Sequence, residues 1–100
     1  MDRQLRERFV LDYLGRQKSR LADRYGVSQI ILFGSTARGE AREDSDVDIA
    51  VQTDLADYFK LFDLKEELEQ GLGAPVDLIR LRTRMNPALK ARIEREGVRV

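Results

Sequence analysis

The chain has 100 residues, a formal net charge of zero, no cysteine and no histidine. That length suits one small domain with little room for a separate substrate-binding domain, and the missing cysteine excludes disulfides, thiolate zinc sites and cysteine nucleophiles. Proton transfer would have to use a carboxylate, Lys or Tyr, and a metal site would need oxygen ligands, which favour Mg²⁺, Ca²⁺ or Mn²⁺.

The charges are unevenly distributed along the chain. Residues 1–39 hold 4 acidic and 8 basic side chains, and residues 40–79 hold 12 acidic and 3 basic ones. Residues 80–100 hold 2 acidic and 7 basic side chains. Such blocks can be ordinary solvated surface, or a metal-binding centre flanked by surfaces suited to phosphate or an acidic partner. Since no apolar stretch approaches membrane length and the first residues are charged, we expect a cytoplasmic protein.

The first part of the chain predicts a helix followed by a buried strand. From Arg3 to about Tyr25, apolar residues recur at spacings of three and four, which predicts an amphipathic helix that Gly26 can end. Residues 27–33, VSQIILF, are β-branched and almost continuously apolar, as is typical of a strand covered on both faces. A short helix or turn is expected over residues 35–40, and a loop follows it.

A second strand is predicted for DVDIAV, which begins at Asp46. Its alternation places Val47, Ile49 and Val51 on one face and the aspartates on the other. Asp46 and Asp48 should therefore lie side by side, with their Cα atoms roughly 6.5 Å apart.

A second long helix is predicted from about Leu55 to Leu72, with Gly71 and Gly73 as the residues that stop it. Its apolar surface, which includes Phe59 and Phe62, is wider than one stripe. That width can mean a broad buried face, or a surface that partly meets a partner.

The last part of the chain predicts a strand and a helix with clear end signals. APVDLIRL reads as a third strand, with Pro75 at its start, where no ladder donor is needed. In NPALKARIEREG, Asn86 suits the N-cap, Pro87 the first helical position and Gly97 the residue past the end. The tail, residues 98–100, could add an edge strand.

This order of elements predicts a single α/β (α+β) domain over residues 1–100, in which helices flank a small mixed sheet of three or four strands. The strand order cannot be deduced from these patterns.

The sequence partly matches two known motifs for phosphate or metal binding, but each match fails at a required position. Gly34 and Gly39 have the glycine spacing of a Walker A loop, but Glu40 stands where the lysine should be. The run that starts at Asp44 opens like an EF-hand loop, but its sixth position is Ile49 rather than glycine.

What remains is a Gly34-Ser35 pair, ten residues, Asp46-x-Asp48, and a further acid, Asp77, on the third strand. Gly34 allows a sharp turn that exposes backbone amides, and the Ser35 hydroxyl can donate to phosphate oxygens. Two carboxylates on one side of a strand repel each other unless cations lie between them, and a pair of Mg²⁺ ions is common in phosphoryl-transfer sites.

The segment GSTARGEAREDSDVDIAV resembles the signature of the DNA polymerase β-type nucleotidyltransferases. The chain's length resembles that of the minimal nucleotidyltransferases (MNT), whose bacterial members are often paired with HEPN-domain toxins. The resemblance covers residues 27–81 and extends to the ending RMNPALKARIEREGVRV. It implies a nucleotidyltransferase fold, two Mg²⁺ ions, and transfer of AMP from ATP to a hydroxyl, with release of pyrophosphate.

Carried over to this sequence, the resemblance implies a role for each motif residue. Gly34 and Ser35 would hold the triphosphate, and Asp46 and Asp48 would bind the metals. Asp77 would complete the metal site and accept the proton of the incoming hydroxyl.

The resemblance also implies that Arg38, which fits the family's small-Arg-Gly step, neutralises phosphate charge. The expected acceptor is a tyrosine of a HEPN toxin, with this chain acting as its antitoxin and neither nucleic acid nor membrane bound directly. Two alternatives stay open: a binding module that blocks its partner by contact alone, and a small-molecule nucleotidyltransferase whose acceptor site is completed by a dimer.

Overall fold

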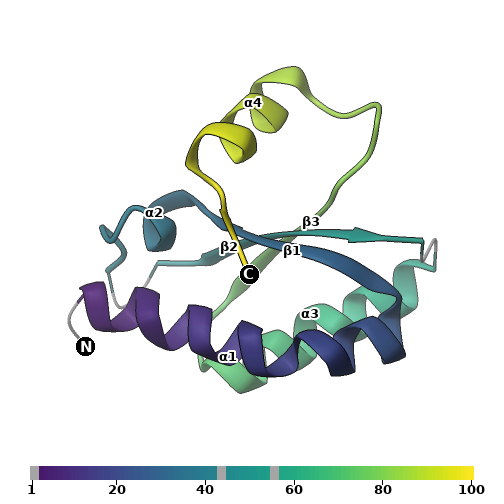
Figure 1. Cartoon of the computed structure of the whole chain (residues 1–100), viewed down its shortest axis with the longest axis horizontal. Helices are drawn as coiled ribbons and strands as arrows, with labels where there is room; N and C mark the ends of the chain where they lie inside the picture. The colour runs from purple at the N-terminus through teal and green to yellow at the C-terminus, as the bar shows by residue number, and fades with distance from the viewer. Residues whose placement is uncertain (1–2, 43–44, 55–56) are drawn as a thin grey trace.

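Helices and strands alternate along most of the chain in a computed structural model that describes residues 3–42, 45–54 and 57–100. In chain order the elements are α1 (Arg3–Tyr25), β1 (Val27–Phe33), α2 (Gly34–Ala37), β2 (Val47–Thr53), α3 (Tyr58–Leu72), β3 (Val76–Arg80), α4 (Pro87–Glu96) and β4 (Val98–Arg99) (Figure 1). Within the described part of the chain, no helix is both long and apolar enough to cross a membrane.

The strands form one mixed sheet in the order β3-β2-β1-β4. β1 pairs antiparallel with both β2 and β4, whereas β2 and β3 run parallel. The predicted mixed sheet is therefore confirmed, and so is the edge strand at the tail, where Arg99 and Val98 lie opposite Ile31 and Leu32. Because β2 and β3 are parallel, both begin at the same end of the sheet.

Helices cover the two faces of the sheet unequally: α1 and α3 lie side by side on one face, and α4 lies over the other (Figure 1). The larger apolar cluster lies between the sheet and α1 and α3 and includes Val47, Ile49 and Val51, which confirms the predicted alternation in β2. A smaller cluster on the opposite face gathers Ala50 with residues of β1 and α4.

The helix starts follow the capping chemistry of the sequence. Asn86 caps α4 by accepting from the N–H groups of Ala88 and Leu89 at 2.9 and 3.2 Å, and Pro87 occupies the first turn, as predicted. The described part of α3 begins at Tyr58, with Asp57 as its N-cap. The predicted start at Leu55 lies outside the described residues.

Gly71 does not stop α3, contrary to the sequence prediction. The helix continues to Leu72 and ends at Gly73, whose φ of 66° is the left-handed conformation that glycine adopts without strain. Gly71 instead lies against α1, because a Cβ at this position would collide with the ring of Tyr13. The glycine thus leaves room for the Tyr13 ring between the two helices.

The wide apolar surface of α3 is only partly buried. Leu64, Leu68 and Leu72 enter the core, whereas Phe59 is 85 % exposed and Phe62 is 55 % exposed. A broad buried face is therefore the wrong interpretation for the two phenylalanines, which lie in the first turns of the helix.

Two glycine substitutions separate close helix packing from helix propensity. Gly15 in α1 has open space where a Cβ would lie, so Gly15→Ala should raise the free energy of unfolding by about 0.5–1 kcal/mol. Gly71→Ala should not raise the free energy of unfolding, because the new methyl group must displace Tyr13, which costs about 1–3 kcal/mol. Urea denaturation measures both, and an equal gain for the two variants would contradict the contact of the Tyr13 ring with Gly71.

Candidate functional site

The turn from β1 into α2 brings Gly34 against a carboxylate of the neighbouring strand. Phe33, the last residue of β1, is paired with Asp48 of β2. Gly34 follows with a φ of 74°, and a Cβ at this position would collide with the Asp48 carboxylate. Glycine is therefore required here both for the backbone conformation and for the space beside Asp48.

The residues after Gly34 form one short turn of helix. The N–H of Arg38 donates to the Gly34 carbonyl at 3.2 Å, and the N–H of Glu40 donates to the Ser35 carbonyl at 2.9 Å. Ser35 is partly buried, one residue beyond the glycine that contacts Asp48. The predicted Gly-Ser turn and short helix are confirmed, with the helix at Gly34–Ala37.

The predicted acids lie at the start of β2 and β3. Asp48 and Asp77 are in register on these parallel strands, so they are direct neighbours across the ladder. Asp46 lies just before β2, which begins one residue later than predicted, at Val47. Asp48 is half-buried, while Asp46 and Asp77 are exposed. Residues far apart in the sequence thus meet at one end of the sheet.

The loop before Asp46 is anchored to α1 by an arginine that the sequence patterns do not single out. Arg6 is largely buried and donates through Nη2 to the Ser45 carbonyl at 2.6 Å and through Nη1 to the Arg42 carbonyl. Two carbonyls of the loop therefore share one guanidinium, which fixes the chain just before β2. In the sequence, Arg6 is one of several charged residues of an amphipathic helix, so no local signal marks this role.

The carboxylates affect one another electrostatically. Burial raises the pKa of Asp48, the neighbouring Asp77 and Asp46 carboxylates raise it further, and Arg92 of α4 opposes them. Asp48 therefore bears its negative charge at a cost while no cation balances it, because both partial desolvation and like charges disfavour the ionised form. This environment suits a bound cation.

The donor set fits Mg²⁺ shared with a substrate better than a closed protein cage. Over residues 3–42, 45–54 and 57–100, no group of three or more acidic, His or Cys side chains is arranged to hold a metal ion by itself. Mg²⁺ is usually held by one or two carboxylates together with substrate phosphates. Asp48, with Asp77 and Asp46 as its neighbours, offers such an incomplete oxygen set beside a glycine turn.

Two arginines flank the glycine turn. Arg38, which the resemblance implies as a phosphate-neutralising residue, directly follows α2. Its guanidinium donates hydrogen bonds to the carboxylates of Glu96 and Glu40, both at 3.0 Å. Arg92 was not predicted; its guanidinium lies 5.7 Å from the centre of the Phe33 ring. In the sequence, Arg92 is part of an ordinary charged helix surface, and only the packing of α4 over the sheet brings it here.

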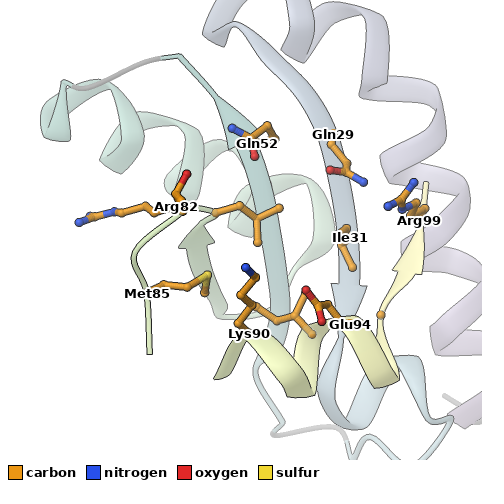
Figure 2. A pocket seen from close by; sticks show the side chains of 12 residues that line it. Gln29, Ile31, Gln52, Arg82, Met85, Lys90, Glu94 and Arg99 are labelled. Carbon is orange, nitrogen blue, oxygen red and sulfur yellow. The ribbon is translucent and has the colours of Figure 1, made fainter. Parts of the chain in front are cut away.

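A cavity of about 580 Å³ lies on the same face of the sheet, farther along β1 and β2. In Figure 2, Gln29 and Gln52 come from the two strands and Lys90 and Glu94 from α4, while Arg82 and Met85 belong to the segment that leads into this helix. None of the three candidate aspartates lines the cavity. It is therefore distinct from the carboxylate cluster.

Comparison with known proteins agrees with this geometry. Residues 17–100 match the family model described as polymerase beta, nucleotidyltransferase. The protein adenylyltransferase MntA of Thermococcus cleftensis is 43 % identical over 83 residues, which are 82 % of this chain and 79 % of the relative.

Two solved structures share the fold. A toxin–antitoxin structure with AMP-PNP matches with a TM-score of 0.70 and 28 % identity, over 93 % of this chain and 70 % of the other. A complex of a tri-AMPylated Shewanella oneidensis HEPN toxin with MNT antitoxin matches with a TM-score of 0.60 and 26 % identity. The match covers 97 % of this chain and 70 % of the other. The chain therefore belongs to the polymerase β-like nucleotidyltransferase family, as its sequence motif predicted, and it is a nucleotidyltransferase.

Proposed function

We propose that this chain transfers AMP from ATP to a tyrosine hydroxyl of a HEPN-type toxin and thereby acts as an antitoxin. The observation that carries the proposal is the register pairing of Asp48 with Asp77 on parallel strands, directly beside the turn at Gly34. A protein acceptor is supported by the adenylyltransferase name of the Thermococcus cleftensis relative and by the AMPylated toxin in the Shewanella oneidensis complex.

Each residue of the site has a role in the proposed reaction. Gly34 and Ser35 hold the triphosphate through the turn, and Arg38 offsets its charge. Asp46 and Asp48 are the metal-binding carboxylates, and Asp77 completes that set. Two Mg²⁺ ions, when bound, would neutralise the triphosphate and lower the pKa of the attacking hydroxyl.

The transfer is a displacement at the α-phosphorus of ATP. The acceptor oxygen forms a bond to this phosphorus, the bond from phosphorus to the bridging oxygen breaks, and pyrophosphate leaves. The hydroxyl proton passes to Asp77, which is exposed and so can be reached by a protein acceptor. Most of the rate enhancement would come from positioning and charge neutralisation, because phosphoryl transfer needs little covalent chemistry from the enzyme.

The partner surface is part of the same proposal. Tyr58, Phe59 and Phe62 are exposed at the start of α3, and aromatic residues are enriched at protein interfaces. The basic C-terminal segment, residues 80–100, is a second candidate contact with the toxin. We further propose that residues 1–100 act as one minimal domain, and that the ATP-consuming reaction takes place in the cytoplasm.

The double variant Asp46→Asn, Asp48→Asn tests the chemistry. With purified toxin, Mg²⁺ and radiolabelled ATP, AMP transfer should fall by roughly 100-fold or more, because several kcal/mol of charge stabilisation are lost. Intact-mass measurement of the toxin checks the product. Asp23→Asn, which changes an exposed acid on α1, is the control and should keep full activity.

Transfer by the double variant at the wild-type rate would rule out the proposed mechanism. If the wild-type chain binds and inhibits the toxin with neither ATP nor added mass, the chain acts by contact alone.

Asp48→Asn should also stabilise the protein while metal and nucleotide are absent. Folding raises the pKa of Asp48, so the ionised form lowers stability at neutral pH, and the penalty disappears as the pH falls below the ordinary value of the unfolded chain. In EDTA at pH 7 the variant should therefore melt at a higher temperature than the wild type, and the difference should shrink towards pH 3.

When Mg²⁺ and AMP-PNP are added, the wild type should melt at a higher temperature than Asp48→Asn, because only the wild type gains the full binding energy. A variant that melts lower than the wild type in EDTA at pH 7 would show that the Asp48 carboxylate is not under electrostatic strain.

A further inference from the structure

One carboxylate joins the two arginines beside the glycine turn. Glu96, at the end of α4, accepts through a single oxygen, Oε2, from Arg38 Nη1 at 3.0 Å and from Arg92 Nε at 3.2 Å. The Glu96 side chain is 18 % exposed, whereas those of Arg38 and Arg92 are 37 % and 43 % exposed. The Glu96 side chain is therefore more buried than the two arginine side chains that it joins, which stay accessible to a ligand.

The location of Arg92 links α4 to the reaction site. Its guanidinium lies over the ring of Phe33, the residue that precedes Gly34 and pairs with Asp48. Arg92 is thus on the β1 side of Asp48. Because the strand order is β3-β2-β1, Asp77 lies on the opposite side of Asp48, on β3.

This arrangement fits the geometry of an in-line displacement. The attacking and leaving oxygens lie on opposite sides of the reacting phosphorus. If Asp77 on β3 receives the proton of the attacking hydroxyl, the pyrophosphate must leave towards β1. Arg92 is a cation on that side of Asp48, over Phe33.

Arg92 also has donors to offer. A guanidinium carries five N–H groups, and Glu96 engages only the Nε–H of Arg92. No other hydrogen bond joins this guanidinium to the part of the chain that the structure describes. Its two amino groups are therefore available to phosphate oxygens, whose geometry a planar guanidinium matches with two parallel bonds.

We propose that Arg92 binds the pyrophosphate portion of the nucleoside triphosphate, and that Glu96 is a positioning residue which orients Arg92 and Arg38 towards it. This inference rests on the proposed nucleotidyltransferase site and extends it from the Gly-Ser turn to α4. It assigns the last helix of the chain a direct part in substrate binding, in addition to its packing on the sheet.

The test compares the affinities of AMP-PNP and AMP, each with Mg²⁺, by isothermal titration calorimetry. Arg92→Ala should weaken AMP-PNP binding about 10- to 100-fold, as expected for a lost charge-assisted hydrogen bond, and should change AMP binding less than threefold. Arg92→Lys should recover part of the loss, since it keeps the charge but not the paired donors.

Glu96→Gln tests the positioning role. It should weaken AMP-PNP binding less than Arg92→Ala does. Combined with Arg92→Ala it should add less than it does alone, because only its contact with Arg38 then remains. Glu94→Gln, an exposed acid on the same helix without an ion pair to any described residue, is the matched control and should bind as the wild type does. Melting temperatures of all variants are measured alongside.

Each of the following results would overturn all or part of the inference. Equal losses of AMP and AMP-PNP affinity in Arg92→Ala, or a lower melting temperature with unchanged affinities, would mean that Arg92 only packs on Phe33. Fully additive effects of Arg92→Ala and Glu96→Gln would remove the positioning role. A wild-type chain that binds no AMP-PNP would refute the proposed function as well, whereas wild-type binding with unaffected variants refutes this inference alone.

Discussion

The repulsion among carboxylates held at one end of the sheet is the constraint on which the site depends. Asp48 is fixed by its pairing with Phe33 on one side and Asp77 on the other, so it cannot move away from the neighbouring acid without breaking the ladder. Its partial burial disfavours its charge still further. The energy of folding is thus used to hold negative charges together, and a cation with a bound triphosphate would relieve that cost.

The rest of the fold maintains this arrangement. The opposite face of β2 carries Val47, Ile49 and Val51 into the main core under α1 and α3, which fixes the register of the strand. A slip by one residue would turn the aspartates into the main core and take the valines out of it, at a cost of several kcal/mol from lost packing alone. Arg6 holds the loop before β2, and α4 brings Arg92 over the other face. The site therefore depends on contacts with both the first and the last helix.

Much of the fold and of the candidate site could be predicted from the sequence, because short stretches of neighbouring residues determine these features. Caps such as Asn86, the alternation of β2 and the glycine at the β1–α2 turn are each specified by a few neighbouring residues. The roles of Arg6, Gly71 and Arg92 could not be predicted, because each arises from a contact with a residue distant in the sequence: the Ser45 carbonyl, Tyr13 and Phe33. A single sequence gives no measure of such contacts, and the exposure of Phe59 likewise depends on where neighbouring elements end.

The central claim is that the aspartate cluster and a nucleoside triphosphate together complete a two-cation site that neither forms alone. The most direct measurement is a titration with Mn²⁺ as a substitute for Mg²⁺, in which electron paramagnetic resonance counts the bound ions with and without AMP-PNP. The account predicts two tightly bound ions per chain when protein and nucleotide are together, one more than the nucleotide holds alone, and weak binding to the protein without nucleotide. A count that does not change when the protein is added to the nucleotide would contradict it.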